Sequence, residues 1–407
     1  MSIRTVLFWT HLLCGVIAGI VIAVMSVTGV LLTYQRQITA WADMRAYRTG
    51  PPSAGATHLP VDALVSRAAA QRTGDAPMTL TLRSDPTAPA SVAMGQRTLF
   101  LNPYSGDVWG EGAPGVRAFF RSVTEWHRWF AASTEHRAAA RAVTGASNLA
   151  FFVIVLSGPI LWWPKRLTGT QLRNIAWFRG GLSPKARDFN WHNTMGIWAA
   201  VPLVVIVGSG VVMSYPWANN LVYRMAGEQP PVAAGRGGEA GGGRGNRGGP
   251  GAGGRGEGGR VAGDAGQTGA ETTLDLLVAR AAAQRPAWRT IALRLPVPPG
   301  PVALTVDEGD GGQPQRRGTL TLDPATGAVV KWEGQGDLTA GRRARSWLRF
   351  AHTGEVYGLV GQTVAGLASL AGAVLVWTGI ALAFRRFLAW RQRRSNPVAR
   401  ERSRPAA

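Results

Sequence analysis

The sequence predicts a membrane protein with an all-α bundle of four transmembrane helices and two small α+β modules outside the membrane, arranged as an internal tandem duplication. Four charge-free stretches predict the helices, because each is at or above the ~20 residues that a helix needs to cross a bilayer. They are residues 12–34, 142–164, 193–217 and 356–384. Repeated short sequences between them predict the modules, and a histidine at or just before the start of each stretch predicts a function at the membrane boundary.

The net charge of +21 fits a lipid bilayer as the partner better than nucleic acid. The arginines are scattered, and the densest basic runs flank the stretches, at residues 165–187 and 385–404. Short basic loops stay in the cytoplasm, whereas loops as long as 36–140 and 218–350 translocate largely regardless of charge. We therefore expect both chain ends in the cytoplasm and both long loops outside. Residues 12–34 are expected to remain as an anchor, because this run is too long for a cleaved signal peptide.

The two long loops share sequence. Residues 64–72 (LVSRAAAQR) return as residues 277–285 (LVARAAAQR), and residues 101–106 (LNPYSG) return as residues 322–327 (LDPATG). The alanine-rich pieces have helical spacing, and the others are turn signals because proline fixes φ and glycine accepts a positive φ. Alternation predicts strands at residues 78–82, 98–101, 291–295 and 319–322. Each loop is therefore expected to hold one α+β module.

These features divide the chain into a series of predicted segments. In order they are the first transmembrane helix (1–35), the first outer module (36–115), an interfacial helix with the second transmembrane helix (116–164), a cytoplasmic loop (165–190), the third transmembrane helix (191–217), a Gly- and Arg-rich linker (218–270), the second outer module (271–345), the fourth transmembrane helix (346–386) and a basic cytoplasmic tail (387–407). The linker is expected to be flexible, because it has hardly any apolar side chain to bury.

The transmembrane stretches repeat as well. His11 precedes Thr28-Gly29 by 17 positions, and His192 precedes Ser209-Gly210 by the same 17. The other two stretches carry Ser157-Gly158 and Thr378-Gly379. Small residues let membrane helices approach closely, and we interpret these four hydroxyl-glycine pairs in that way rather than as direct cofactor contacts.

The histidines form two pairs by depth. His11 and His192 begin the outward-running helices, near the cytoplasmic face, whereas His127 and His352 begin the inward-running helices, near the outer face. Neutral imidazole is a common axial ligand of haem iron, and helical bundles place such ligands on facing helices. The pattern predicts two b-type haems, one in each leaflet, whose irons are bound by His11 with His192 and by His127 with His352.

A further histidine, His136, stands closer to the second stretch and is the alternative ligand there. The repeat favours His127, since Arg121-Ser122 precedes it by six positions and Arg345-Ser346 precedes His352 by seven. His136 is then expected to be a neighbour of the ligand. His58, in the first outer module, is predicted to be a surface residue.

Several other residues lie near the boundaries. Asp188 and Glu355 stand close in sequence to ligand histidines, and we interpret them as solvated boundary charges, with orientation of an imidazole as the alternative. Tryptophans at the ends of the stretches predict an interfacial belt. Trp198 and Trp377 are deeper and are expected to pack between helices, with packing on a porphyrin as the alternative. The single cysteine, Cys14, excludes an internal disulfide and a cysteine-ligated cluster.

With these residues, the chain resembles the PepSY-associated transmembrane family, which includes bacterial ferric-siderophore reductases. The matching pieces are residues 126–128 (WHR), 156–164 (LSGPILWWP), 191–198 (WHNTMGIW), 213–215 (MSY) and 352–358 (HTGEVYG). Together they extend over nearly the whole chain except the linker and the tail. The resemblance implies four spans, two outer PepSY-like modules, histidine-bound haem, and reduction of siderophore-held iron on the periplasmic side of the bacterial inner membrane.

We therefore expect an inner-membrane haem b protein that carries electrons across the bilayer to a periplasmic acceptor, with ferric iron in a siderophore as the expected substrate. Hard oxygen donors hold Fe(II) less well than Fe(III), so reduction releases the metal. The sequence has no nucleotide fingerprint, so the donor is separate: a cytoplasmic reductase, free reduced flavin or a membrane quinol. The alternative is a non-redox membrane protein whose PepSY modules bind or inhibit a peptidase or sense the envelope.

Overall fold

The computed structural model describes residues 2–72, 77–95, 97–163, 168–231, 274–297 and 299–395. The chain divides into two units. The helical unit consists of Met1–Gln35, Phe120–Gln229 and Ala344–Ala407, and the sheet unit consists of Arg36–Phe119 and Pro230–Arg343. Lys165, Arg166, most of the predicted linker and the last twelve residues of the tail lie outside the described residues, so the predictions made for them stay predictions.

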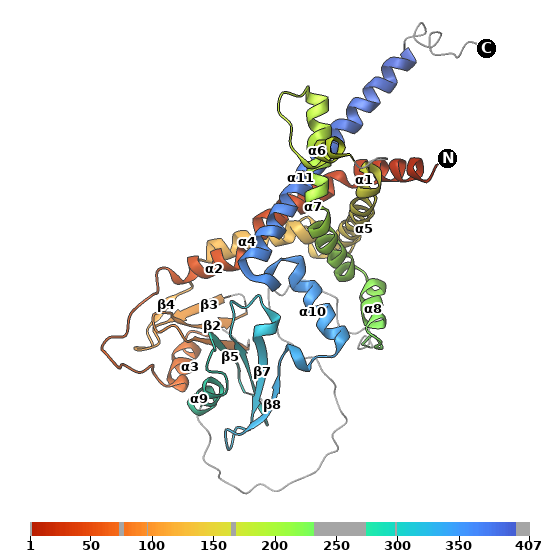
Figure 1. Cartoon of the computed structure of the whole chain (residues 1–407). Coiled ribbons are helices and arrows are strands. Elements are labelled where there is room, and N and C mark those ends of the chain that lie inside the picture. Colours follow the sequence, from red (N-terminus) through yellow and green to blue (C-terminus); the bar gives the residue numbers. More distant parts are fainter. Residues whose placement is uncertain are drawn as a thin grey trace, which may run out of the picture. The chain divides into compact units, whose positions relative to one another are not determined.

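Four long helices dominate the helical unit. They are α1 (Ile3–Leu32), α5 (Arg137–Trp162), α7 (Pro184–Ser214) and α11 (Gly358–Ser395). Helix α1 packs on α5 and α11, and α7 packs on the same two, which closes the helices into a ring (Figure 1). All four lie in segments that are long and apolar enough to cross a membrane, so the predicted number of spans is confirmed for the described residues.

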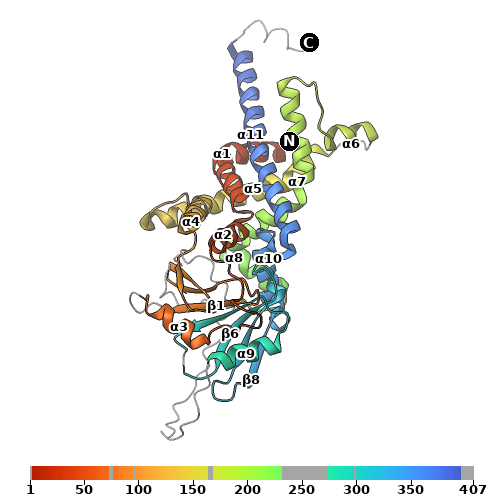
Figure 2. The same ribbon diagram turned by 90° about the vertical axis from the view of Figure 1, so that its left-hand side faces the viewer.

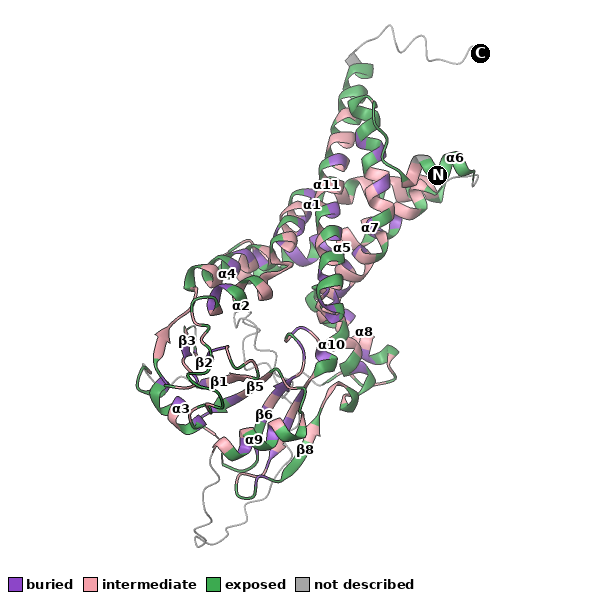
Figure 3. Ribbon diagram, turned by 60° about the vertical axis from the view of Figure 1, so that its left-hand side comes forward, coloured by how far each residue is buried: buried purple, intermediate pink, exposed green. Residues whose placement is uncertain are grey.

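The outer surface of this bundle is apolar. Ile20 on α1, Val201 on α7 and Trp377 on α11 are 75%, 76% and 73% exposed. Figure 3 shows the outward faces of these helices as largely exposed, while the buried positions lie along their contacts. The interior is filled by small and branched residues such as Leu203 and Ala371. A surface with this many large apolar side chains is the kind that lipid covers.

Short helices precede two of the long ones. Helix α4 (Pro114–Trp129) leads into α5, and α10 (Ala340–His352) leads into α11. A left-handed turn follows each, at Phe130 and Ala131 (φ 53° and 50°) in the first case and at Gly354 (φ 74°) in the second. A Cβ at Gly354 would collide with the backbone of Gly361, so the second turn requires glycine. Because of these turns, His127 and His352 lie on short helices rather than on the long ones.

Two further helices, α6 (Gly169–Ala176) and α8 (Pro216–Met225), belong to the helical unit, whereas α2 (Gln35–Met44) falls almost entirely in the sheet unit. Helix α8 includes residues 218–225, which the sequence placed at the start of the linker. A proline at its first position, where the missing N–H needs no partner, starts this helix.

The described part of the sheet unit contains eight strands, helix α2 and two helices that pack on the sheet. The strands are β1 (Met78–Arg83), β2 (Ala90–Met94), β3 (Arg97–Leu101), β4 (Val108–Gly110), β5 (Thr290–Leu295), β6 (Val302–Asp307), β7 (Arg317–Leu322) and β8 (Val329–Glu333). All neighbours are antiparallel, in the order β4-β3-β2-β1-β5-β6-β7-β8. Each loop thus supplies four strands in chain order, and β1 joins β5 at the centre.

One face of the sheet carries its core. Helices α3 (Val61–Ala69) and α9 (Leu274–Gln284) pack on each other and on this face (Figure 2). Leu80 and Leu304 on the strands are 1% and 0% exposed. The predicted helices and the strands at 78–82, 98–101, 291–295 and 319–322 are confirmed. The prediction of separate modules did not include the β1–β5 pairing, which makes the strands from both loops one sheet.

Candidate functional site

Two of the predicted ligands meet inside the bundle. His11 lies in α1, two turns from its first residue, and His192 lies in a similar position in α7. Their imidazole centroids are 6.4 Å apart, with the ring planes at 74°. Both helices begin well before their charge-free stretches, at Ile3 and Pro184, so both histidines lie within a helix rather than at its start.

The other two predicted ligands meet in the same way. His127 is near the end of α4, and His352 is the last residue of α10. Their centroids are also 6.4 Å apart, at an interplanar angle of 66°. The helical unit therefore contains two imidazole pairs with the same separation.

The alternative ligand His136 lies elsewhere. Its side chain is 75% exposed, at the start of α5, and its Nε2 is 3.5 Å from the carboxylate of Glu135. His58 is exposed in the sheet unit, where its ring stands edge-on to Tyr104 at 4.8 Å. Neither is near a second histidine in the ring contacts of the described residues.

Each paired histidine has a hydroxyl partner on a neighbouring helix. The Nδ1-to-oxygen distances are 2.8 Å for His11 with Ser157, 2.8 Å for His127 with Thr28, 2.9 Å for His192 with Thr378 and 3.1 Å for His352 with Ser209. These are the hydroxyls of the four hydroxyl-glycine pairs. Within each half of the chain these bonds run in both directions. The histidine of α1 bonds a hydroxyl of α5, and the histidine of α4 bonds a hydroxyl of α1. In the same way, the histidine of α7 bonds a hydroxyl of α11, and the histidine of α10 bonds a hydroxyl of α7.

The hydroxyls determine which nitrogen carries the proton. Each donates its own hydrogen to a carbonyl one turn earlier in its helix, as Ser157 does to Ile154 (3.1 Å) and Thr378 does to Val374 (2.8 Å). The oxygen can then only accept from Nδ1–H. At His352 the Ile206 carbonyl, 2.8 Å from Nδ1, requires the same tautomer because a carbonyl cannot donate. In the neutral imidazoles, Nε2 is left with a free lone pair.

The glycines of these pairs lie at close contacts in three of the four cases. A Cβ added at Gly379 would lie 3.3 Å from Cε1 of His192, at Gly29 3.2 Å from the hydroxyl of Ser369 on α11, and at Gly210 2.9 Å from the amide of Asn148. At Gly158 the nearest atom, Cε1 of His11, would lie at an ordinary contact distance of 3.8 Å. The packing interpretation accounts for Gly29 and Gly210, but it missed the hydroxyls, which orient imidazoles.

A signal for the hydroxyls was present in the sequence. Seventeen residues separate His11 from Thr28 and His192 from Ser209. In an α-helix this spacing is a rise of about 25 Å, nearly the thickness of the hydrocarbon core. A hydroxyl that far from the histidine of its own helix lies at the depth of the opposite histidine pair. The repeated spacing could therefore have identified the hydroxyls as partners of the other pair.

Two interpretations of neighbouring residues were wrong. Asp188 is 4% exposed rather than solvated, and its carboxylate pairs with Arg187 at 3.0 Å and with Arg385 at 2.8 Å. Trp198 and Trp377 do not pack between helices, being 64% and 73% exposed. Trp198 donates its indole N–H to the Ala176 carbonyl at 2.9 Å, which ties α7 to α6.

The donor set suits one class of metal centre. Among the described residues, no group of three or more His, Cys, Asp or Glu side chains is arranged to hold a bare metal ion. A metal ion held between two imidazoles, at the bond length of about 2.0–2.1 Å that histidine makes to zinc, would separate the ring centroids by about 6.3 Å. The pairs, at 6.4 Å, would therefore suit two imidazole donors to one metal whose other donors come from a macrocycle.

Comparison with known protein families gives a match over most of the chain. The family described as the PepSY-associated TM region matches residues 8–386, a range that includes all four paired histidines and both strand-bearing loops. No curated protein matches the chain. Since the family covers far more than half of the sequence, the chain belongs to the PepSY-associated transmembrane family.

Proposed function

We propose that this protein is a haem b carrier that moves electrons across the bacterial inner membrane to a periplasmic acceptor, with ferric iron in a siderophore as its substrate. His11 and His192 hold one haem, and His127 and His352 hold the other. A haem held in this way would supply one-electron transfer.

One observation carries this proposal. Two imidazole pairs have the centroid separation of trans axial ligands, 6.4 Å in each case. In both pairs the Nδ1 atoms are engaged by serine or threonine. Hydrogen bonds of this kind fix the tautomer and ring orientation of metal-binding histidines and raise their basicity. With Nδ1 engaged in this way, Nε2 is the nitrogen of each ring that would bind a metal.

The rest of the chain fits the same function. The helices α1 and α7 would run outward from the cytoplasm, which places the His11 pair on the inner side and the His127 pair on the outer side. Both strand-bearing loops then lie in the periplasm, and their shared order of one helix and four strands supports two duplicated PepSY modules. An electron leaving the outer pair would reach a ferric complex on that side. No residue of the chain is assigned acid-base work.

The experiment is the visible spectrum of the purified protein. Protein expressed with a haem supply should contain close to two haem b per chain by pyridine haemochrome, and dithionite should sharpen its Soret band and split the α and β bands. A value near one would mean that one pair is wrongly assigned. Colourless protein would refute the haem proposal and favour the non-redox alternative, in which the modules bind a peptidase or sense the envelope.

A further inference from the structure

Three arginines of the helical unit gather beside the outer histidine pair. Arg128 directly follows His127 in α4, and Arg349 lies three residues before His352 in α10. The third, Arg141, lies near the start of α5. All three side chains are exposed. Because they come from three different helices, the fold and not a single basic run of sequence brings them together.

The depth of Arg141 matches that of the outer pair. It stands 16 residues before Ser157 in α5, which is a rise of about 24 Å, and Ser157 bonds His11 of the inner pair. The hydroxyl of Thr144 lies 3.0 Å from the carbonyl of Arg128 and 3.2 Å from that of Arg141. This contact holds the end of α4 against the first turns of α5.

The three charges act on one another. Arg141 and Arg349 both repel the guanidinium of Arg128. Arg128 is also within electrostatic range of His127, and Arg349 is within range of His352. Like charges held this close destabilise the fold, so their assembly indicates a site where an anion binds among them.

Two of these arginines have no protein carboxylate as a partner. Arg128 lies over the ring of Trp129 at 5.0 Å, and Arg349 lies over the ring of Phe350 at 5.7 Å. In the part of the chain that the structure describes, neither forms an ion pair with an Asp or Glu. An aromatic ring engages the face of a guanidinium and leaves the N–H donors at its edge available to an acceptor.

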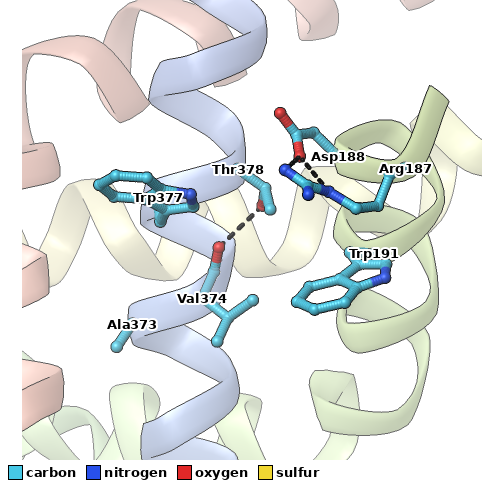
Figure 4. A pocket seen from close by; sticks show the side chains of 7 residues that line it. All are labelled: Arg187, Asp188, Trp191, Ala373, Val374, Trp377 and Thr378. Carbon is cyan, nitrogen blue, oxygen red and sulfur yellow. Dashed lines mark hydrogen bonds and ion pairs between the residues drawn. The ribbon is translucent and has the colours of Figure 1, made fainter. Parts of the chain in front are cut away.

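The inner pair has a different charge environment. Asp188 lies four residues before His192 in α7, and its buried carboxylate is shared by Arg187 at 3.0 Å and Arg385 at 2.8 Å. Figure 4 shows Arg187 paired with Asp188 on α7, and across from them on α11 Thr378, the hydroxyl partner of His192. The protein itself therefore supplies an anion at the inner end, whereas Arg128 and Arg349 have none at the outer end.

We propose that Arg128, Arg141 and Arg349 bind the propionate carboxylates of the outer haem, an inference that rests on the proposed function. A haem b held by His127 and His352 carries two carboxylates that the imidazoles do not engage. A guanidinium presents its N–H donors in a fork that matches a carboxylate. Two carboxylates among three guanidiniums relieve the repulsion and leave one positive charge in excess. The arginines are positioning residues, which retain the haem and determine its orientation between the histidines.

The test measures haem retention in the full chain in lipid nanodiscs, with apomyoglobin as the haem acceptor. In Arg128→Gln and Arg349→Gln, half of the haem should be lost about tenfold faster, since each variant removes a hydrogen bond between charged groups. The matched control is Arg121→Gln, which removes an exposed charge from α4 six residues before His127 and should leave the rate unchanged. Equal rates in all three variants would overturn the proposal.

A second arm identifies the anion. Apoprotein refilled with haem dimethyl ester, whose propionates carry no charge, should lose it at the same rate in the unaltered chain and in Arg128→Gln. A tenfold difference that persists with the ester would mean that the substitution acts through the fold, which would also overturn the proposal. With haem b, the midpoint potential of one haem should fall in Arg128→Gln, because loss of a nearby positive charge favours the ferric state.

These outcomes separate the inference from the haem proposal. If the chain holds two haem b but both cluster variants retain them as the unaltered chain does, the arginine assignment is wrong and the haem proposal stands. Unchanged retention together with a raised KM for a ferric siderophore would overturn it in favour of an anionic ferric complex as the partner of the arginines. Protein that binds no haem would refute both.

Discussion

The hydroxyl of Thr28 on α1 accepts a hydrogen bond from Nδ1–H of His127, which lies 99 residues further along the chain, with 2.8 Å between the oxygen and the nitrogen. The hydroxyl also donates to the Val24 carbonyl at 2.6 Å, so both its hydrogen and its acceptor face are used. Valine has nearly the same shape as threonine but cannot accept a hydrogen bond, which makes this contact directly testable.

We expect Thr28→Val to weaken haem retention at the outer pair. Loss of a partner that orients a metal-binding histidine costs about 10–100-fold in metal affinity. The measurement is haem content after dilution into apomyoglobin, which removes weakly held haem. The matched control is Thr33→Val, since Thr33 donates to the Gly29 carbonyl of its own helix at 3.2 Å. Equal haem loss in both variants would mean that the effect is one of helix packing.

Removal of the ligands should separate the two pairs. His192→Ala and His352→Ala should each lose about half of the haem absorbance, because one missing axial ligand weakens retention of one haem. In His352→Ala the remaining haem should still be reducible, while reduction of a ferric siderophore should stop. His136→Ala should change neither, since that side chain is 75% exposed. Bleaching by His136→Ala but not by His127→Ala would show that the outer ligand is misassigned.

Membrane orientation can be measured with a periplasm-dependent reporter. Fusion within residues 235–260 should give active reporter, and fusion after Arg391 should give none, because the basic runs near 165–187 and 385–404 hold those segments in the cytoplasm. The reverse pattern would exchange the inner and outer pairs, and the direction of electron flow with them.

The strands from the two loops should behave as one cooperative sheet. Leu80 in β1 is 1% exposed, and β1 pairs with β5 from Met78 to Arg83. We expect Leu80→Ala to cost about 2–5 kcal/mol and to accelerate amide exchange in β5–β8 as well as in β1–β4. Val329→Ala, at a 43% exposed position in β8, should stay within about 0.5 kcal/mol. Faster exchange confined to β1–β4 would mean that the two halves open independently.

The membrane helices could be predicted because a long charge-free run admits few other structures. The histidine pairing could also be predicted, since His11 and His192 stand at equal distances from hydroxyl-glycine pairs. Strand β2 could not be assigned in the same way, whereas β6 was missed although its buried and less buried positions alternate. In β2 Ala90, Ser91 and Val92 are all buried, so its composition lacks the alternation of a half-exposed strand.

Other features depend on tertiary contacts that leave no local pattern. Asp188 is a charged residue near a predicted helix boundary, and its burial depends on Arg385, nearly 200 residues away in the chain, as well as on the adjacent Arg187. The β1–β5 pairing is of the same kind, because either strand could equally have been the edge of a separate sheet. Periodicity in the sequence predicts whether a segment is a helix or a strand, but it does not predict which other segment that strand pairs with.

The reciprocal hydroxyl bonds and the histidine pairs connect different parts of the chain. Each half of the chain orients its own imidazoles, since His11 bonds Ser157 and His127 bonds Thr28. Each half nevertheless supplies only one imidazole to each histidine pair. A chain that ended after α6 would therefore contain two oriented imidazoles but no complete pair. Any group bound between the imidazoles of a pair would therefore connect the first half of the chain to the second.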